Sequence, residues 1–285
     1  MGEEGKVFPP FSKIRTKGAK SMEKINVEHL TKTFGQTGVL HDVSFSVNDG
    51  EFLSILGPSG CGKTTILRIL IGLETADSGK IIKDGNDITT APSAQRRMGI
   101  VFQNYALFEN MTVLKNVTYA LINSATTKGK YSKAEAEKSA KEMLELVGLA
   151  AHLDKKPRQL SGGQQQRVAI ARTLALNPDV ILFDEPMSAL DVDTRLSLRS
   201  ELKELQKRFG TTMIYITHDQ EEAFAMSDRI MVMDAGVIHQ LDTPQNIIDH
   251  PADDYVRRFV IKNINTKINS LIQFARSSDA AEDAK

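Results

Sequence analysis

The sequence predicts an α/β protein whose parallel sheet is covered by helices on both faces. Short apolar segments, such as the run from Val180 to Phe183, have the composition of buried strands. Helical patterns, for example at 193–209, alternate with these segments along the chain. A glycine-rich loop at 57–65 lies between an apolar segment and a helical one, which indicates a strand–loop–helix unit.

The first hundred residues are predicted to be mainly strands. Alternating apolar residues and β-branched residues indicate strands in this part of the chain. The segment EFLSIL runs directly into the glycine-rich loop, and helix formers then continue through 66–71. The expected strands are 25–30, 39–47, 51–56, 80–83 and 98–102.

From about 104 to 177 the pattern becomes mostly helical. Within this region, 132–147 is predicted to be an amphipathic helix capped by Ser132 or its neighbour. After Pro178 strands and helices alternate again. The expected elements there are VILFDEP at 180–186, a helix at 193–209, TTMIYITHD at 211–219, a short helix near 219–227 and RIMVM at 229–233.

The composition is that of an ordinary globular protein and excludes several classes. Lys plus Arg and Asp plus Glu both number 36, so the charge balance gives no support for a nucleic-acid partner. The single cysteine, Cys61, excludes an intrachain disulfide and suits a reducing compartment. No apolar run approaches the roughly 18–20 residues of a membrane span, and the N-terminus lacks the apolar core of a secretory signal. We therefore expect a cytosolic protein that serves a membrane only by docking to another protein.

The glycine-rich loop fits the phosphate-binding pattern G-x-x-x-x-G-K-[ST]. Its glycines let successive backbone N–H groups curl around phosphate oxygens. Lys63 would supply positive charge to the β- and γ-phosphates, and the Thr64 hydroxyl would ligate Mg²⁺. Cys61 is interpreted as a small side chain that fits the loop, in preference to a redox group. The predicted phosphate-binding residues are Gly57, Pro58, Ser59, Gly60, Cys61, Gly62, Lys63, Thr64 and Thr65.

Two carboxylates and a histidine follow apolar strands elsewhere in the chain. Adjacent strand residues face opposite ways, so Asp184 is assigned to the metal and Glu185 to the attacking water. A strand that simply ends in a charged turn is the alternative. His218 follows another apolar strand and is predicted to face the same crevice and sense the γ-phosphate. A purely structural histidine is the alternative there.

The segment LSGGQ at 160–164 places a serine and two glycines directly before a predicted helix. A helix N-terminus with free N–H groups and a positive dipole end is a good seat for an anion. A simple N-cap with a flexible entry explains the same residues, and the segment alone does not separate the two interpretations.

Five motifs occur in one order: GPSGCGKTT at 57–65, LSGGQ at 160–164, ILFDEP at 181–186, SALD at 188–191 and ITHD at 216–219. This set resembles the ATP-binding subunits of ABC transporters over about residues 22–262. The resemblance implies ATP hydrolysis with Mg²⁺. It also implies a P-loop NTPase (RecA-like) core with a parallel sheet, an antiparallel β subdomain and a helical subdomain inserted at about 104–177.

The resemblance also implies roles for further residues. Gln103 would couple the core to the helical insert and contact Mg²⁺ or water, so that Thr64, Gln103 and Asp184 would surround the metal. Phe34 would stack on adenine, with ordinary core packing as the alternative. Asp191 would lie in a loop that crosses a dimer interface. The signature residues Ser161, Gly162, Gly163 and Gln164 would contact the nucleotide held by the Lys63 loop of a second copy, which implies a head-to-tail homodimer with two ATP molecules sandwiched.

Two stretches, 102–117 and 240–260, resemble the importer branch of the family, which serves polyamine, iron, phosphonate or sugar uptake. That branch implies transmembrane permease subunits, a solute-binding protein and a place on the cytoplasmic face of the membrane. Its members commonly continue into a C-terminal regulatory β-barrel domain, which we expect to be absent here. Met187 stands where importer relatives usually have Leu, a swap of similar volume.

The expected regions are a flexible extension at 1–21, with Met22 as an alternative start, an ATPase domain at 22–262 and a weakly helical tail at 263–285. The leading functional hypothesis is the energising ATPase of an importer. A soluble ABC ATPase without a transporter and an exporter half-subunit are the alternatives. Tyr105, Leu107 and Phe108 are expected to line a groove for a helix of the permease, or else to belong to the core of the helical insert.

Overall fold

The computed structural model describes residues 23–266, 268 and 269. The expected N-terminal extension, the alternative start and the polar end of the tail lie outside the described residues. The strands are β1 (Glu23–Phe34), β2 (Thr37–Asn48), β3 (Phe52–Leu56), β4 (Ser78–Lys83), β5 (Asn86–Asp87), β6 (Met98–Val101), β7 (Val180–Asp184), β8 (Thr212–Thr217), β9 (Arg229–Asp234) and β10 (Val237–Asp242). The α-helices are α1 (Lys63–Ile71), α2 (Val113–Asn123), α3 (Lys133–Leu146), α4 (Gly162–Leu174), α5 (Val192–Phe209), α6 (Gln220–Met226), α7 (Pro244–Asp249) and α8 (Asp254–Val256). Short 3₁₀ turns lie at Ser93–Gln95, Ala150–His152 and Pro157–Gln159, and a π-helical stretch spans Arg257–Lys262.

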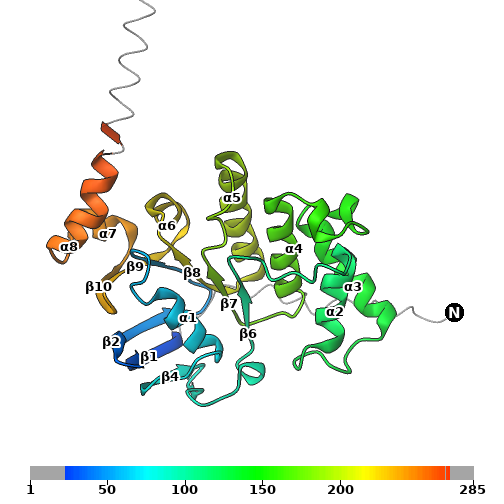
Figure 1. Cartoon of the computed structure of the whole chain (residues 1–285), viewed down its shortest axis with the longest axis horizontal. Coiled ribbons are helices and arrows are strands. Elements are labelled where there is room, and N and C mark those ends of the chain that lie inside the picture. The colour runs from blue at the N-terminus through cyan, green and yellow to red at the C-terminus, as the bar shows by residue number, and fades with distance from the viewer. Residues whose placement is uncertain (1–22, 267, 270–285) are drawn as a thin grey trace, which may run out of the picture.

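A six-stranded sheet with the order β10-β9-β3-β8-β7-β6 forms the centre of the fold (Figure 1). The neighbours among β6, β7, β8, β3 and β9 all run parallel, and β10 pairs antiparallel with β9 at the edge. Every residue of β3 and β8 is buried, as expected for strands covered on both faces. The predicted parallel sheet is confirmed, and the β9–β10 hairpin adds an antiparallel edge.

Alternate residues of the central strands pack into two different cores. Leu53 and Ile55 of β3 join a cluster with α1 and the antiparallel sheet, whereas Phe52 joins a cluster with the helices on the other face. In β7, Val180 and Leu182 face the first core and Phe183 the second. This alternation covers both faces of the sheet, as the sequence predicts.

A second sheet, with the order β2-β1-β4-β5, is antiparallel throughout. Its strands β1 and β2 have 12 residues each, so β1 ends four residues after the predicted 25–30, whereas β2 exceeds the predicted 39–47 by only one or two residues at each end. Polar residues at both ends of β1 interrupt the apolar pattern, but backbone pairing continues through them. The sheet corresponds to the expected antiparallel β subdomain.

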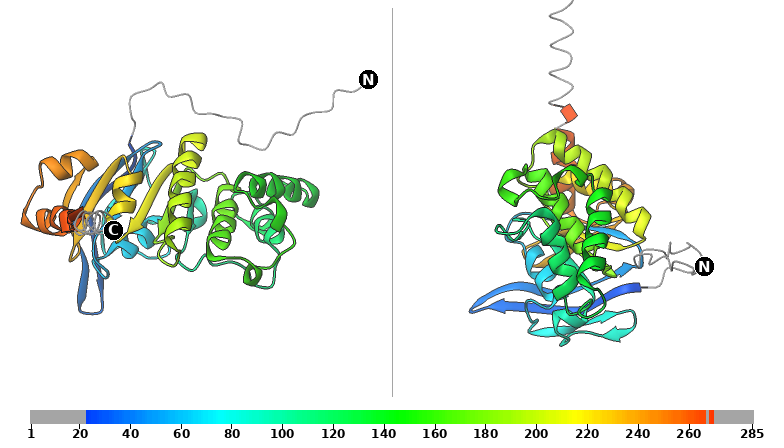
Figure 2. Two further views of the ribbon diagram at one scale, coloured as in Figure 1. Left: turned by 90° about the horizontal axis from the view of Figure 1, so that it is seen from above. Right: turned by 90° about the vertical axis from the view of Figure 1, so that its right-hand side faces the viewer.

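Helices α2, α3 and α4 gather at one end of the molecule, and the C-terminal helices lie at the other (Figures 1 and 2). The cap predicted for α3 is confirmed, because Ser132 Oγ accepts from the Glu135 N–H at 3.3 Å and Glu135 Oε2 accepts from the Ser132 N–H at 2.8 Å. The three α-helices between Val113 and Leu174 form the helical part of the fold.

One part of the groove expectation is wrong. Tyr105 is only 7% exposed and belongs to the core beneath the helices, because its ring turns inward where the backbone takes a φ of 61°. Leu107 is half-buried and packs against the same core. Phe108 is 41% exposed and meets the Tyr119 ring edge-on at 5.0 Å between ring centroids. Phe108 and Tyr119, and not Tyr105, form the exposed aromatic surface of this subdomain.

The C-terminal segment packs on α6 and β9 through a third, smaller cluster that includes Val256 and Val260. Helical structure continues through 263–266 and again at 268 and 269, in agreement with the weak helix expected there. Within the described part of the chain, no helix is both long enough and apolar enough to cross a membrane.

A buried arginine closes the C-terminal end of α1, the helix that begins at the phosphate loop. Arg96 is 3% exposed. Its guanidinium donates to the carbonyl oxygens of Ile69 at 2.7 Å, Leu70 at 2.9 Å, Thr89 at 2.9 Å and Ala91 at 2.8 Å. Carbonyls at a helix C-terminus lack partners within the helix, so this side chain satisfies groups that would otherwise be buried and unpaired.

Replacing Arg96 with Met is expected to lower the free energy of unfolding by about 2–4 kcal/mol, because several buried carbonyls lose their donor. Urea unfolding followed by circular dichroism measures the change. Arg97→Met is the matched control, since the Arg97 side chain is 61% exposed and its ion pair with Asp179 is worth about 0–1 kcal/mol. Equal stability of the two variants would contradict the assigned role of Arg96.

The N-termini of α4 and α5 touch each other through glycines. A Cβ atom at Gly163 would lie 2.4 Å from Thr194 Cγ2, and one at Gly162 would lie 3.1 Å from Leu190 Cδ2. Thr194 cannot easily rotate away, because its Oγ1 donates to Asp191 Oδ2 at 2.7 Å. Gly163 of the LSGGQ segment is therefore needed for packing within the chain, whereas Gly162 makes a tight contact that a small shift of Leu190 could relieve.

Gly163→Ala is expected to destabilise the fold by about 1–3 kcal/mol through this collision, although alanine is ordinarily favoured over glycine in a helix by about 1 kcal/mol. Thr194→Ser removes the colliding methyl and keeps the hydroxyl that bonds Asp191. The double variant should recover most of the loss, with Thr194→Ser alone as the control in thermal unfolding. A Gly163→Ala protein as stable as wild type would show that α4 and α5 can separate freely.

Candidate functional site

The glycine-rich loop leaves β3 and curls into the first turn of α1. Gly60 and Gly62 have φ angles of 82° and 104°, which side chains with a Cβ rarely adopt. A Cβ at Gly57 would lie 2.4 Å from the Met233 carbonyl oxygen, so the backbone also approaches β9 closely there. The loop needs glycine for its conformation and for its packing.

Lys63 is buried at the centre of this loop. Its Nζ donates to the carbonyl oxygens of Gly57 and Pro58, each at 2.8 Å, and lies 3.9 Å from Glu185 Oε1. The loop thus wraps around its own ammonium group and holds it at the N-terminus of α1, where the helix dipole also favours an anion.

Cys61 is buried beside Lys63 in the same loop, and burial raises the pKa of its thiol. A raised thiol pKa favours a space-filling role over a redox role.

Thr64 lies in the first turn of α1 and Asp184 at the end of β7, and their side chains are in contact. Thr64 Oγ1 donates to Asp184 Oδ1 at 3.0 Å. Burial raises the pKa of Asp184, and the neighbouring Glu185 carboxylate raises it further. A half-buried carboxylate beside a hydroxyl is a donor set that fits Mg²⁺, which is held by one or two protein oxygens together with phosphate oxygens.

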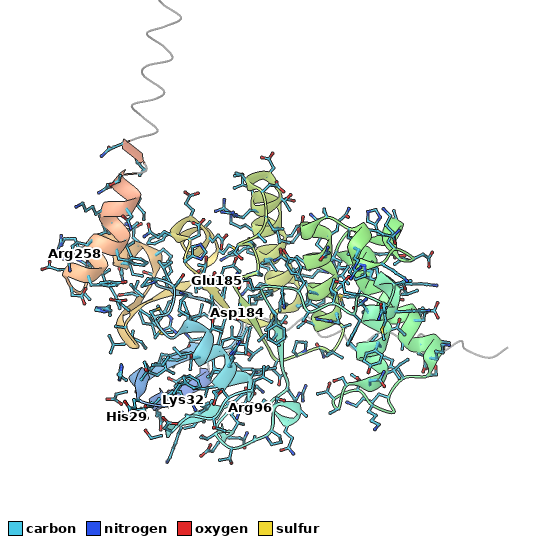
Figure 3. All side chains as sticks on the ribbon, viewed as in Figure 1. His29, Lys32, Arg96, Asp184, Glu185 and Arg258 are labelled. Atoms are coloured by element: carbon cyan, nitrogen blue, oxygen red, sulfur yellow. The ribbon has the colours of Figure 1, made fainter. Side chains whose placement is uncertain are left out.

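Glu185 directly follows Asp184, and its backbone takes a φ of 44°, in the left-handed region; both residues are labelled near the centre of Figure 3. Its N–H still donates to the Ile216 carbonyl oxygen at 3.1 Å, so it remains attached to β8. Its carboxylate lies 3.0 Å (Oε2 to Nδ1) from His218, which directly follows β8. Asp184 thus contacts Thr64 whereas Glu185 contacts His218, and backbone strain of this kind is common at functional sites.

Gln103 approaches the same place from the loop after β6. Its Nε2 donates to Ser188 Oγ at 3.1 Å, and Ser188 Oγ donates to the Glu185 carbonyl oxygen at 3.1 Å. Ser188 was not singled out by the sequence analysis, although it lies in the SALD motif. The structure therefore brings six predicted residues to one edge of the sheet: Lys63, Thr64, Gln103, Asp184, Glu185 and His218.

The signature residues at 160–164 lie at the N-terminus of α4 and not at the phosphate loop of the same chain. Ser161 caps α4, since its Oγ accepts from the Gln164 N–H at 3.3 Å and Gln164 Oε1 accepts from the Ser161 N–H at 3.1 Å. Among the described residues, no hydrogen bond or ion pair joins 160–164 to the loop at 57–65. Asp191 likewise caps α5, by accepting from the Thr194 N–H at 3.0 Å.

Phe34 stands at the end of β1 and is 46% exposed, which excludes ordinary core packing. Lys32 Nζ lies 4.9 Å from the centroid of its ring. The sequence analysis missed Lys32, although its spacing of two residues from Phe34 on a strand puts both side chains on one face.

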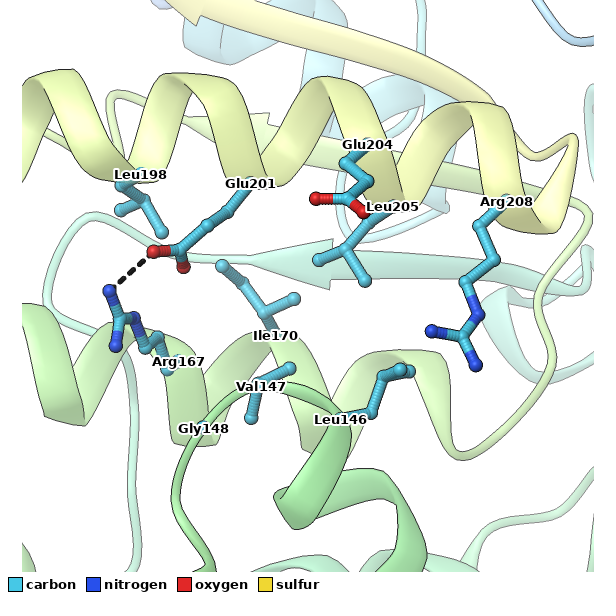
Figure 4. A pocket seen from close by; sticks show the side chains of 10 residues that line it. All are labelled: Leu146, Val147, Gly148, Arg167, Ile170, Leu198, Glu201, Glu204, Leu205 and Arg208. Carbon is cyan, nitrogen blue, oxygen red and sulfur yellow. Dashed lines mark hydrogen bonds and ion pairs between the residues drawn. The ribbon is translucent and has the colours of Figure 1, made fainter.

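A cavity of about 260 Å³ lies between the end of α3, α4 and α5 (Figure 4). Arg167 and Glu201 form an ion pair across it. It contains none of the predicted site residues, so it is separate from the site at the sheet edge. Its lining residues are Leu146, Val147, Gly148, Arg167, Ile170, Leu198, Glu201, Glu204, Leu205 and Arg208.

Comparison with known proteins identifies the family of the chain. Residues 40–188 match the family model described as ABC transporter. The chain is 49% identical over 236 residues to the spermidine/putrescine import ATP-binding protein PotA of Aliivibrio fischeri, covering 83% of this chain and 62% of that protein. It is 50% identical over 231 residues to the PotA protein of Oleidesulfovibrio alaskensis, covering 81% and 61%. The chain thus spans about three fifths of the length of these curated relatives.

Two solved structures share the fold. One is an ATP-binding cassette solved as a dimer in a post-hydrolysis state with ADP and Pi, with a TM-score of 0.70 and 36% identity over 77% of this chain and 98% of that one. The other is cbiO1 from Clostridium perfringens, part of the ABC transporter complex cbiONQ, with a TM-score of 0.74 and 28% identity over 90% and 100%. Fold, motif order and sequence identity agree, and the chain belongs to the ABC transporter family.

Proposed function

We propose that the chain is an ATP-hydrolysing subunit that energises solute import. One observation carries this proposal: a single sheet edge holds a phosphate loop with its lysine, a hydroxyl–carboxylate pair and a second carboxylate bonded to a histidine. Phosphoryl transfer to water requires charge neutralisation, positioning and a base, and these groups supply all three.

The loop and Lys63 bind the phosphates. The Lys63 ammonium lies beside the carbonyl oxygens of Gly57 and Pro58 at the N-terminus of α1, where it would supply positive charge to bound phosphates. Thr64 and Asp184 would hold Mg²⁺, which would neutralise charge on the phosphates. Phe34 supports an adenine site, because its exposed ring offers a face for stacking.

Glu185 is the proposed base for the attacking water. To accept a proton from that water, its carboxylate must be held in a fixed position. The hydrogen bond with His218 orients the Glu185 carboxylate. The hydrogen bond from the Glu185 N–H to the Ile216 carbonyl oxygen fixes the backbone from which that side chain extends. The exposed ring of His218 leaves Nε2 free to meet the γ-phosphate. Gln103, through Ser188, bonds the loop that carries Glu185 and connects it to the helical subdomain.

Ser161 and Gly162 are exposed at the N-terminus of α4 and make no contact with their own phosphate loop. A helix N-terminus of this kind favours an anion, and a phosphate held by a second copy could supply it. The solved relative that is a dimer with ADP and Pi supports this arrangement. The proposal is therefore a head-to-tail homodimer with two ATP molecules, in which Asp191 lies near the interface.

The relatives named for spermidine/putrescine import make a polyamine the first solute to test, and they favour an importer over the soluble and exporter alternatives. Import requires permease subunits and, in this branch, a solute-binding protein, with the ATPase on the cytoplasmic face of the membrane. The exposed pair of Phe108 and Tyr119 is the proposed contact for the permease, with Arg172 stacked 5.8 Å from the Phe108 ring centroid.

Glu185→Gln is expected to lower the ATPase kcat by about 10²–10⁴-fold, the usual contribution of a positioned base, while ATP still binds. Phosphate release measures the rate, and size-exclusion chromatography with ATP should show a persistent dimer. Glu204→Gln makes the same chemical change at an exposed position of α5 and should behave as wild type. A Glu185→Gln rate within twofold of wild type would remove Glu185 from the mechanism.

Capture of tagged Glu185→Gln chain with ATP from detergent-solubilised host membranes should retain a multi-span permease at one copy per two ATPase chains. Adding Phe108→Ser should abolish that retention and labelled spermidine uptake. Adding Ile248→Ser, a change at an apolar residue 42% exposed on α7, should leave both unchanged. Retention of a ribosome in place of a membrane protein would instead support the soluble alternative.

A further inference from the structure

Arg195 lies in the first turn of α5 and reaches two loops that carry the proposed catalytic groups. Its Nη2 donates to the Leu190 carbonyl oxygen at 3.0 Å, and its Nη1 donates to Asp219 Oδ2 at 3.3 Å. Leu190 ends the loop that begins at Glu185, and Asp219 directly follows His218. One planar guanidinium thus bonds both loops.

The Asp219 end of this bridge is rigid. Its Oδ1 accepts from the N–H groups of Glu221 at 2.8 Å and Glu222 at 3.4 Å, which caps α6. Its own N–H donates to Thr217 Oγ1 at 2.9 Å. A displacement of the Asp219 carboxylate would therefore also displace the turn at 217–219, which carries His218.

A buried carboxylate reinforces the same end. Glu222 Oε2 accepts from the hydroxyls of Tyr215 and Thr217, each at 2.8 Å, and burial raises the pKa of its carboxyl. Arg195 Nε lies 3.7 Å from Glu222 Oε1. The guanidinium therefore faces two carboxylates and is held on the side of β8 and α6.

The Leu190 end is rigid as well. The Leu190 N–H donates to the Met187 carbonyl oxygen at 3.1 Å, and Ser188 Oγ bonds the Glu185 carbonyl oxygen. The Leu190 side chain packs against the signature helix at Gly162. Arg195 thus connects a loop that touches the signature to the turn that carries His218.

We propose that Arg195 is a positioning residue for the proposed hydrolysis, which ties the loop at 185–191 to the turn at 217–219 and so keeps the carboxylate of Glu185 against His218. That bond joins groups on separate loops, and His218 is half-exposed, so water would compete for it if the loops moved apart. A guanidinium bonds both loops at once with a fixed fork, which an ammonium cannot reproduce.

Arg195→Met keeps most of the side-chain volume and removes the bridge. Its ATPase kcat is expected to fall by about tenfold to a hundredfold, the effect of a displacement near 1 Å at a reacting group, while KM for ATP changes less than about threefold because the phosphate loop is untouched. Arg199→Met is the matched control on the same helix, since Arg199 makes no hydrogen bond or ion pair in the described part of the chain. Arg195→Lys should recover only part of the rate.

A double-mutant cycle with His218→Ala separates positioning from general stability. If Arg195 acts through His218, Arg195→Met should lower the residual single-turnover rate of His218→Ala by less than about twofold. Asp219→Asn breaks the same ion pair and keeps the cap, so it should reproduce the kcat loss if Arg195→Met fails to fold.

Full additivity with His218→Ala, or a kcat of Arg195→Met equal to that of Arg199→Met, would overturn the inference. So would a normal kcat for Asp219→Asn. A wild-type protein without ATPase activity would overturn the proposed function and this inference with it, whereas an active wild type with a normal Arg195→Met rate overturns the inference alone.

Discussion

Parallel backbone pairing of β3, β8 and β7 is the constraint on which the rest of the site depends. In this register Leu56 lies beside Thr217 and Asp184 beside Ile216, so the three strands end within one residue of each other. The next residues along the chain are Gly57, His218 and Glu185. Because parallel strands present their carboxyl ends together, one ladder of backbone hydrogen bonds brings the phosphate loop, the histidine and the carboxylate to one place.

The loops beyond this edge are held by close packing and by buried or half-buried cations. Arg96 closes the far end of α1, Lys63 organises the phosphate loop, and Arg195 bridges the two loops that carry Glu185 and His218. Each cation bonds backbone carbonyls, so it satisfies polar groups that the loops cannot pair among themselves. The paired glycines of the signature add a close helix–helix contact that links this edge to the helical subdomain.

Sequence reasoning succeeded where a local pattern has one physical cause. The buried central strands, the strand–loop–helix unit around 57–65 and the helix capped at Ser132 follow from strand composition, glycine conformations and helix capping, all of which are local. It failed for Tyr105, whose aromatic ring is consistent with an exposed groove or a core. The choice depends on a backbone turn at φ 61° and on helices that pack from elsewhere in the chain. The predicted ends of β1 and β2 were short for a similar reason, because pairing with a neighbouring strand extends through polar residues.

The sequence by itself determined the alternation of strands and helices, the phosphate-binding loop and the chemical types that follow each strand, because these depend on residues close together in the chain. The tertiary structure decided which of those groups meet. Hydrogen bonds between Thr64 and Asp184, between Glu185 and His218, and from Arg195 to Asp219 join residues 24 to 120 positions apart. Contacts over such separations depend on strand order and register, which no local pattern of residues specifies.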